Sequence, residues 1–411
     1  MTKTGYIGFG GSTIIMWKIS KIKKSELCIG CGYCASLFDG KMVINARGFL
    51  EPSGIDNEET DVCPGMEIKR SRLASKGSHP VWGNIKSMFA GHASNHDIRY
   101  QCSSGGGITA ILIYLLDNKF VDAVVHIKAD DTIPYANKLV VSRTAEEIIS
   151  ASGSRYSPSS PLSNIHQLAQ GNEKYAFVGK PCDIYALKKA KENNRDIQNT
   201  FPILISFMCG GIPSLAGALA VAELLGIDEH HIKSYRYRGY GCPGFLTIRT
   251  MDGKTHKVPY HKAWGKILNK FSHLRCKVCA DGVGEFADIV CADFWPTDSK
   301  GFPIFDESDG TNLFMARTEL GEMLIEQCIK LGLINYLFPV KTSELKNIQP
   351  FQYYRKTTVF SRIFSLGLSN RPAPTYRGMN LIKLSVLNPA NQVKGAIGMF
   401  IKRNNHRRIS Y

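Results

Sequence analysis

Four cysteines near the N-terminus constrain this chain more than any other feature of its sequence. Cys28, Cys31 and Cys34 are spaced two residues apart, and a distant Cys63-Pro64 pair follows. Three closely spaced thiolates and a remote Cys-Pro are typical of the ligands of one 4Fe-4S cluster. A C-x2-C-x2-C run suits a tetrahedral zinc ion poorly, although zinc and uncommitted thiols stay open as alternatives. The spacing therefore predicts redox chemistry, in a small ferredoxin-type domain of residues 21–75.

The length and the cysteine usage limit the class of protein. A chain of 411 residues has room for two or three domains. Thiolate ligands must be kept reduced, which favours the cytoplasm. We find no convincing secretory signal, and no segment reaches the roughly 20 apolar residues that span a bilayer. Residues 1–20 have no periodic pattern and are expected to form a loose leader.

Positive charge is concentrated at the C-terminal end. The formal net charge is +16, and the segment from Leu345 onward carries twelve Lys and Arg but no Asp or Glu. Basic pairs at 402–403 and 407–408 follow the apolar run 396–401. This basic extension, residues 341–411, could contact an anionic membrane surface or an acidic partner, or it could be a solvated tail. No motif for nucleic-acid binding accompanies the charge.

The middle of the chain alternates between strand-like and helix-like segments. Ser103 to Gly107 is rich in glycine and leads into an apolar stripe at helical spacing. Free backbone N–H groups at the start of a helix favour an anion, so this turn could hold a phosphate or a flavin diphosphate. The turn is not a G-x-G-x-x-G, and an ordinary glycine-rich helix start is the alternative.

Two further segments could line a cofactor. In Gly153-Ser-Arg-Tyr156, Arg155 could meet a phosphate and Tyr156 could stack on an aromatic ring, although a plain loop with a packed tyrosine is the alternative. Gly179-Lys-Pro-Cys182 follows a buried strand. Ligands of open α/β sheets gather at the carboxyl ends of strands, so this turn is a candidate too.

The remaining cysteines suggest a second site. One complete four-thiolate set would comprise Cys182, Cys209, Cys276 and Cys279, with Cys291 as a reserve ligand. Half of a structural zinc site is the alternative for the C-x2-C pair. The other cysteines have no partner spacing and are expected to be small buried hydrophobes: Cys102, Cys242 and Cys328.

Taken together and in this order, these segments resemble the coenzyme F420 hydrogenase/dehydrogenase beta-subunit family over about residues 85–340. The segments that carry the resemblance are 103–109, 153–156, 178–182, 206–213, 237–239, 275–279, 285–289 and 293–295. The resemblance implies a mixed α/β (α+β) flavin-binding domain after the ferredoxin-like one. It also implies FAD and a second 4Fe-4S cluster, held by the second cysteine set. Its candidates for lining FAD are Ser103, Ser104, Gly105, Gly106, Gly107, Thr109, Gly153, Ser154, Arg155, Tyr156, Gly179, Lys180 and Pro181.

The expected function is that of an iron–sulfur flavoprotein oxidoreductase. Electrons would pass from a ferredoxin or a partner subunit through two 4Fe-4S clusters to FAD and on to an unidentified small-molecule acceptor. A non-catalytic electron-transfer subunit, a tailoring reductase for surface polysaccharides and a zinc-stabilised binding protein are the alternatives. His126, Asp183 and Tyr156 are candidates for a general acid, and we assign the catalytic role to none of them.

Overall fold

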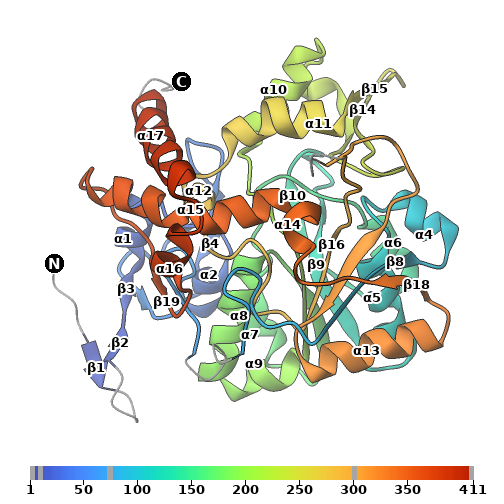
Figure 1. The fold of residues 1–411 in the computed structure, drawn as a ribbon, viewed down its shortest axis with the longest axis horizontal. Helices are drawn as coiled ribbons and strands as arrows, with labels where there is room; N and C mark the ends of the chain where they lie inside the picture. The colour runs from blue at the N-terminus through green and yellow to red at the C-terminus, as the bar shows by residue number, and fades with distance from the viewer. Residues whose placement is uncertain (1–4, 8–12, 72–76, 299–302, 407–411) are drawn as a thin grey trace.

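The computed structural model describes residues 5–7, 13–71, 77–298 and 303–406. Its centre is an eight-stranded mixed sheet with the strand order β10-β9-β11-β12-β16-β17-β8-β18 (Figure 1). The strands are β8 (Ser87–Ala93), β9 (Ala123–Ala129), β10 (Asn137–Ser142), β11 (Tyr175–Val178), β12 (Ile203–Phe207), β16 (Ile289–Asp293), β17 (Asn312–Ala316) and β18 (Ile334–Pro339). The expected mixed α/β fold is confirmed.

Strands β9, β11, β12 and β16 run parallel and are buried on both faces. In β12, for example, Leu204 packs into one apolar cluster, while Ile203 and Ile205 pack into the other. Near-continuous apolar runs such as Ile203-Leu-Ile are typical of strands that helices cover on both sides. The carboxyl ends of these four strands therefore lie at the same edge of the sheet.

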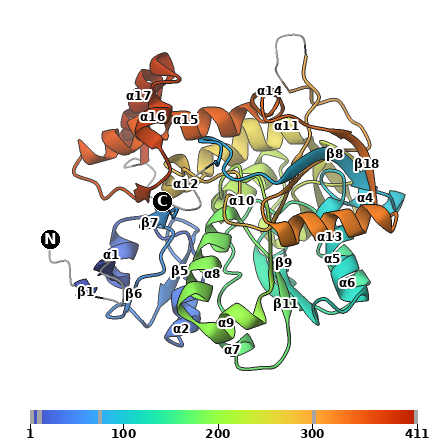
Figure 2. The same ribbon diagram turned by 60° about the horizontal axis from the view of Figure 1, so that its bottom comes forward.

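Helices cover both faces of the sheet (Figure 2). One face carries α5 (Gly107–Asp117), α6 (Ala145–Ser150) and α13 (Glu319–Lys330), and the other carries α7 (Ile165–Leu168), α8 (Pro181–Asn193) and α9 (Arg195–Thr200). Two short helices, α4 (His96–Gln101) and α12 (Leu274–Lys277), lie at the ends of connecting loops.

A smaller unit is inserted between β12 and β16. It consists of α10 (Leu215–Leu224), the 3-10 turn η1 (Glu229–His231) and an antiparallel sheet of β13 (Ile232–Arg236), β14 (Phe245–Thr250) and β15 (Thr255–Pro259). Helical turns α11 (Tyr260–Lys262), η2 (Ala263–Ile267) and η3 (Leu268–Phe271) lead from this sheet back to α12. The smaller unit has an apolar cluster of its own, which includes Tyr235, Tyr237 and Leu246.

The N-terminal segment forms a separate layer against the main body. Its elements are β1 (Gly5–Ile7), β2 (Thr13–Ile15), β3 (Trp17–Lys18), α1 (Ile19–Lys24), α2 (Tyr33–Leu37), β4 (Lys41–Ile44), β5 (Leu50–Ser53), β6 (Glu59–Thr60) and β7 (Glu67–Lys69). The expected leader of residues 1–20 is too long, because Trp17 and Lys18 pair with β6 and Ile19 is buried. Residues 1–4 and 8–12 of that leader lie outside the described residues.

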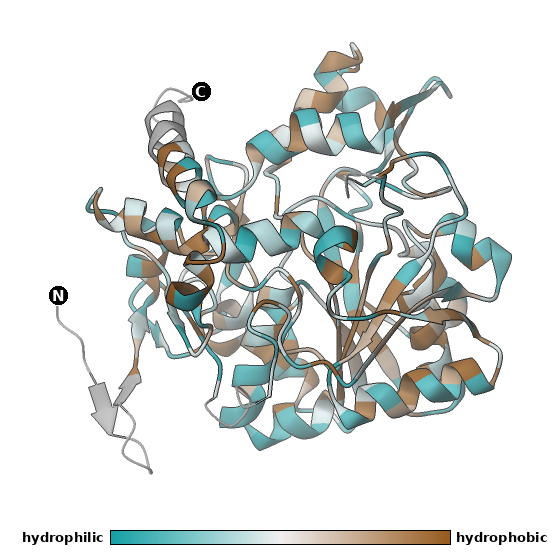
Figure 3. Cartoon of the chain, viewed as in Figure 1, coloured by the Kyte–Doolittle hydropathy of each residue, from teal (hydrophilic) through white to brown (hydrophobic). Residues whose placement is uncertain are grey.

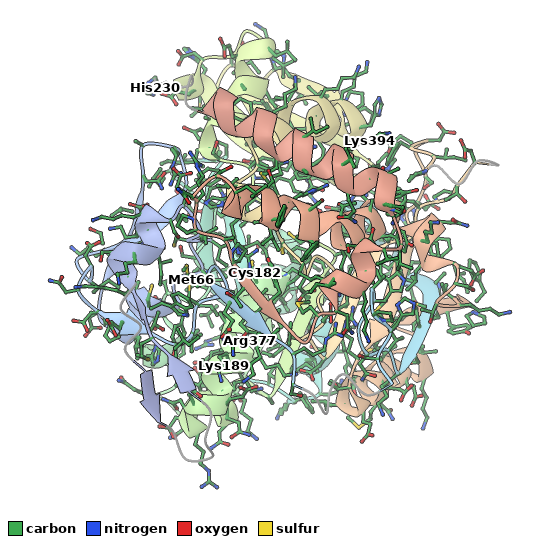
Figure 4. All side chains as sticks on the ribbon, turned by 60° about the vertical axis from the view of Figure 1, so that its left-hand side comes forward. Met66, Cys182, Lys189, His230, Arg377 and Lys394 are labelled. Atoms are coloured by element: carbon green, nitrogen blue, oxygen red, sulfur yellow. The ribbon has the colours of Figure 1, made fainter. Side chains whose placement is uncertain are left out.

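The C-terminal segment holds the N-terminal layer to the body. It comprises α14 (Leu345–Ile348), α15 (Pro350–Gly367), β19 (Thr375–Arg377), α16 (Leu381–Ser385) and α17 (Pro389–His406). Strand β19 pairs in parallel with β7, so Arg377 lies beside Glu67, and Figure 4 shows Arg377 and Met66 on the same side of the molecule. The extension is therefore part of the folded protein as far as it is described.

A buried carboxylate joins all three parts of the chain. Glu285 of the body forms ion pairs with Arg70 from the N-terminal layer and with Lys356 on α15. All three side chains are nearly inaccessible to solvent. Charges buried this deeply are stable only when they are paired. Glu285 thus acts as a common anchor for the two terminal segments.

The end of the C-terminal segment combines exposed apolar side chains with the basic tail. Figure 3 shows apolar residues on α16 and on the described part of α17, where Ile382, Val386, Val393 and Ile397 are exposed. The four basic residues at 402–403 and 407–408 have side chains outside the described residues, so their contact with a membrane or a partner stays a prediction. Within the described residues, no helix has the length and apolar character needed to cross a membrane.

Candidate functional site

The first cysteine set lines one apolar cavity of the N-terminal layer. Cys28 and Cys31 lie in the loop after α1, Cys34 lies on α2, and Cys63 precedes β7. The loop turns at Gly30 and Gly32, which have φ of 71° and 90°. A Cβ on either glycine would meet backbone atoms of Leu50 or Ser163 at less than 3 Å. The two glycines therefore let the C-x2-C-x2-C run curl around a single point.

The four thiols are close enough to affect one another. Burial raises the pKa of Cys34 to about 12, and the neighbouring Cys63 contributes to this shift. Burial also raises the pKa of Cys28, as do Cys63 and Cys34. Backbone N–H groups of Gly30 and Met66 donate to Cys28 and Cys63, respectively. Partly buried thiols that lie close to one another and accept backbone hydrogen bonds match the donor set of a 4Fe-4S cluster.

The second set forms where the carboxyl ends of β11 and β12 meet α12. Cys182 opens α8, Cys209 follows β12, and Cys276 and Cys279 lie on α12 and just after it. Burial raises the pKa of Cys209 to about 12, with Cys276 and Cys279 adding to the shift and the charge of Arg355 opposing it. Burial likewise raises the pKa of Cys182, which Cys209 and Cys279 also affect. Four residues from three distant segments are thus brought together.

Cys291 is not part of this second set. It is on the face of β16 that packs into the cluster of α5 and α13, where its neighbour is Cys328. The adjacent Val290 and Ala292 face the opposite cluster. Because side chains alternate along a strand, Cys291 points away from the side on which α8 packs. The reserve role expected for it is therefore wrong, whereas the burial expected for Cys102, Cys242 and Cys328 is confirmed.

The two cysteine sets are neighbours. The buried carboxyl of Asp183 adds to the raised pKa of both Cys31 and Cys182, although burial is the larger cause for each. Asp183 forms a 2.7 Å ion pair with Lys180, whose Nζ also donates to Ser159 at 2.8 Å. Asp183, one of the candidate general acids, is thus the ion-pair partner of Lys180 and lies between the two sets. In the part of the chain that is described, no three or more His, Cys, Asp or Glu are arranged to hold a single metal ion.

The glycine-rich turn has a tight internal packing role. The N–H of Gly107, at the start of α5, donates to Asn312 Oδ1 at 2.8 Å. A Cβ on Gly107 would meet the ring of Phe314 at 2.4 Å, and a Cβ on Gly105 would meet Asn312 at 2.7 Å. Ser103 connects this turn to the second candidate segment, because its Oγ accepts from the N–H of Ser154. The structure therefore joins two of the three expected cofactor segments.

Arg155 is committed to the protein. Its guanidinium donates to Asn137 Oδ1 at 2.8 Å and to three backbone carbonyls, those of Tyr235, Pro134 and Ala136, at 2.6 to 2.9 Å. It therefore ties the edge strand β10 to β13. Tyr156 is packed against Trp264, whose ring lies over Gly210 beside Cys209. His126 is also structural, since its Nε2 is 2.7 Å from Ser142 Oγ and burial lowers its pKa to about 4.

A large cationic cleft opens next to these segments. It has a volume of about 770 Å³ and lies between the loop 150–155 and the sheet β13–β15. Ser154 and Arg155 are among its lining residues, together with Lys233, Arg236, Arg249 and Lys257, the aromatic Tyr100, Tyr240 and Phe245, and the acidic Asp130 and Asp131. The Nε of Arg236 is buried and has no hydrogen-bond partner among the described residues. The sequence patterns alone did not predict this cleft.

A group of aromatic side chains connects the loop 153–156, which contributes to the cleft, with the loop that follows Cys209. Tyr156 and Tyr260 are part of this group, and Trp295 stacks on Tyr260 at 6.0 Å between ring centres. A buried arginine lies within the group: Arg238 forms a 2.9 Å ion pair with Asp293 at the end of β16. Two of the sequence segments that carry the family resemblance, 237–239 and 293–295, thus meet here.

Helix α15 completes the site from the C-terminal segment. Gln352 Nε2 donates to the carbonyl of Cys209 at 3.1 Å, and Arg355 donates to the same carbonyl. Gln349 Nε2 donates to the carbonyl of Asp293 at 2.6 Å. The extension therefore covers the ends of β12 and β16, which its basic, aromatic sequence alone did not reveal.

Comparison with known proteins identifies the family. Residues 88–166 match the N-terminal model, and residues 172–338 the C-terminal model, of the coenzyme F420 hydrogenase/dehydrogenase beta subunit. The chain belongs to this family. It is 26% identical to the coenzyme F420 hydrogenase subunit beta of Methanococcus voltae over 282 residues, which are 66% of this chain and 88% of that one.

Other members are also redox proteins. This family member is 23% identical over 319 residues to one of the subunits of the F420H2 dehydrogenase of Methanosarcina mazei, covering 74% of this chain and 83% of that protein. A chain of the F420-reducing NiFe hydrogenase complex of Methanosarcina barkeri has the same fold, with a TM-score of 0.56 and 20% identity, over 72% of this chain and 98% of that chain. The family, the α/β body and a redox setting are therefore established.

Proposed function

We propose that this family member is an iron–sulfur flavoprotein that passes electrons from a ferredoxin or a partner subunit to a small-molecule acceptor. Cys28, Cys31, Cys34 and Cys63 would hold one 4Fe-4S cluster, and the second cysteine set would hold another. Such clusters exchange single electrons, whereas a flavin takes up one or two and can release them as a hydride. The observation that carries the proposal is the adjacency of two partly buried four-thiol sets, with Asp183 between them.

We further infer that the cationic cleft accommodates FAD. Arg236, Lys233 and Lys257 supply positive charge for a diphosphate, and Tyr100 or Tyr240 offers a ring face for stacking. The Nε–H of Arg236 has no hydrogen-bond acceptor among the described residues, so it is a candidate donor to a phosphate oxygen. Tyr156 and Trp264 connect the cleft with the loop of Cys209, so an electron that enters at the second set would reach the cleft through these side chains.

The stoichiometry of bound cofactors tests the proposed function directly. The protein is purified without oxygen, and iron, acid-labile sulfide, zinc and released flavin are measured per chain. We expect about eight irons and eight sulfides with one FAD and no zinc. About four irons would leave one cysteine set without a cluster. Zinc without flavin would overturn the redox proposal in favour of a structural metal protein.

The cleft assignment predicts a loss of flavin affinity in Arg236→Gln. A hydrogen bond to a charged group contributes about 1.5–3 kcal/mol, so FAD should bind roughly ten to a hundred times more weakly. Titration of FAD into deflavinated protein measures the affinity. Arg143→Gln is the matched control, because Arg143 is exposed, pairs with Glu173 and does not line the cleft. Equal affinities in both variants would place the flavin elsewhere.

The comparisons also favour a second possibility, that of an electron-transfer subunit without its own acceptor. The solved neighbour belongs to a hydrogenase complex, and the Methanococcus voltae relative is a hydrogenase subunit. Electron transfer from reduced ferredoxin to a soluble dye distinguishes the two functions. Turnover by the purified chain alone would favour an enzyme, and turnover only after addition of another subunit would favour the electron-transfer role.

A further inference from the structure

One buried cation, Arg275, lies between the two cysteine sets. Its side chain is among the largest that are fully buried in the described part of the chain. Within that part, no carboxylate forms an ion pair with it, whereas Arg238, which is buried to the same degree, is paired with Asp293. Burying a guanidinium is costly unless negative charge compensates it. The surroundings of Arg275 therefore need a source of negative charge other than a carboxylate.

The guanidinium binds the backbone of the first site. Arg275 Nε donates to the carbonyl of Gly65 at 2.8 Å, and Nη2 donates to the carbonyl of Pro64 at 2.6 Å. These two residues directly follow Cys63. The guanidinium carbon also lies 5.3 Å from the ring centre of Tyr376 on β19. Because Arg275 directly precedes Cys276 in the sequence, one side chain joins the last ligand segment of the first set to the C-x2-C of the second.

The charge of Arg275 reaches thiols of both sets. The side chain is fully buried and is bound to the backbone that follows Cys63, while its own backbone leads directly into Cys276. Its field therefore favours added negative charge at either site.

Building on the proposed function, we propose that Arg275 is a positioning residue that serves as the common counter-ion of the two clusters. It holds the Cys63 segment against α12 and makes both clusters easier to reduce. Reduction adds one electron to a cluster without making or breaking a bond, and a ferredoxin-class donor supplies that electron. Each thiolate-bound cluster carries net negative charge, which supplies the missing partner for the buried guanidinium.

The test compares the charge-removing variants Arg275→Gln and Arg355→Gln. Arg355 lies beside the second set, because its guanidinium donates to the carbonyl of Cys209. Reductive titration with dithionite, followed by electron paramagnetic resonance, gives the midpoint potential of each cluster. We expect Arg275→Gln to lower the equilibrium constant for reduction of each cluster at least tenfold. For a one-electron step, this lowers each midpoint potential by about 59 mV or more. Arg355→Gln should lower only one.

Iron analysis of each variant separates failure of this inference from failure of the proposed function. If the wild type does not hold about eight irons, the proposed function is wrong and Arg275 has no clusters to serve. If Arg275→Gln holds the same iron as the wild type and shifts neither potential, or only one, the shared role is wrong. If Arg275→Gln does not assemble its clusters, the midpoint potentials are measured in Arg275→Lys, because this variant keeps the positive charge. Potentials in Arg275→Lys near those of the wild type would support the role, and a tenfold shift in both, or loss of clusters from the second set alone, would overturn it.

Discussion

Replacing Cys31 by serine is expected to halve the iron content of the protein, from about eight to about four atoms per chain. Cys31 lines the apolar cavity with Cys28, Cys34 and Cys63, and a 4Fe-4S cluster that loses a thiolate is held by only three. Cys276→Ser should remove the same amount of iron from the second site. The double variant should bind almost none, since the two sets are formed from separate residues.

Cys291→Ala provides the matched control for these variants. Cys291 is a free cysteine like the expected ligands, but it is more deeply buried and packs beside Cys328 on the opposite side of the sheet. We expect its replacement to leave about eight irons in place. Iron lost from Cys291→Ala but kept in Cys276→Ser would mean that the second site has another ligand set. An unchanged iron content in Cys31→Ser would refute the N-terminal cluster.

Glu285→Gln is expected to destabilise the folded protein strongly. The substitution leaves Arg70 and Lys356 as buried cations without their common partner. Breaking a buried ion pair by removing one partner costs about 3–5 kcal/mol. Urea denaturation, followed by circular dichroism under anaerobic conditions, should therefore show a markedly lower midpoint than that of the wild type.

The same variant should loosen both ends of the chain at once. Because Glu285 holds the N-terminal layer through Arg70 and helix α15 through Lys356, limited proteolysis should cut both segments sooner. Glu192→Gln is the control, because it removes only a surface pair with Lys189, and such pairs contribute little. An unaltered urea midpoint in Glu285→Gln would show that the two cations find other partners.

Much of the fold could be predicted from the order of short segments in the sequence. The apolar runs of β11 and β12 are short, rich in β-branched and aromatic residues and followed closely by glycine or cysteine, so they indicate buried parallel strands. Cys182 and Cys209 come soon after these strands, which is why their meeting at one edge of the sheet could be expected. The reserve role of Cys291 is wrong because the strand register turns this side chain to the other face.

Two residues expected to contact FAD form hydrogen bonds within the protein instead, and these bonds could not be read from the sequence pattern. Arg155 has the chemistry of a phosphate ligand, but its donors are taken by Asn137 and by carbonyls of β13 and of the β9–β10 loop. Gly107 is typical of an anion-binding turn, but Asn312, about two hundred residues later, accepts from its N–H. Alternation of Phe245, Thr247 and Arg249 along β14 was the signal that could have revealed the cleft.

The type of chemistry follows from residues that are close together in the chain. The C-x2-C-x2-C run, the C-x2-C pair and the ordered family segments are all local patterns, and local spacing can be recognised without knowledge of the fold. Three contacts required the packed structure: Arg275 lies between the two cysteine sets, Glu285 joins both terminal segments, and α15 covers Cys209. Each of these contacts joins residues far apart in the sequence, so it depends on how strands and layers pack rather than on any neighbouring residue.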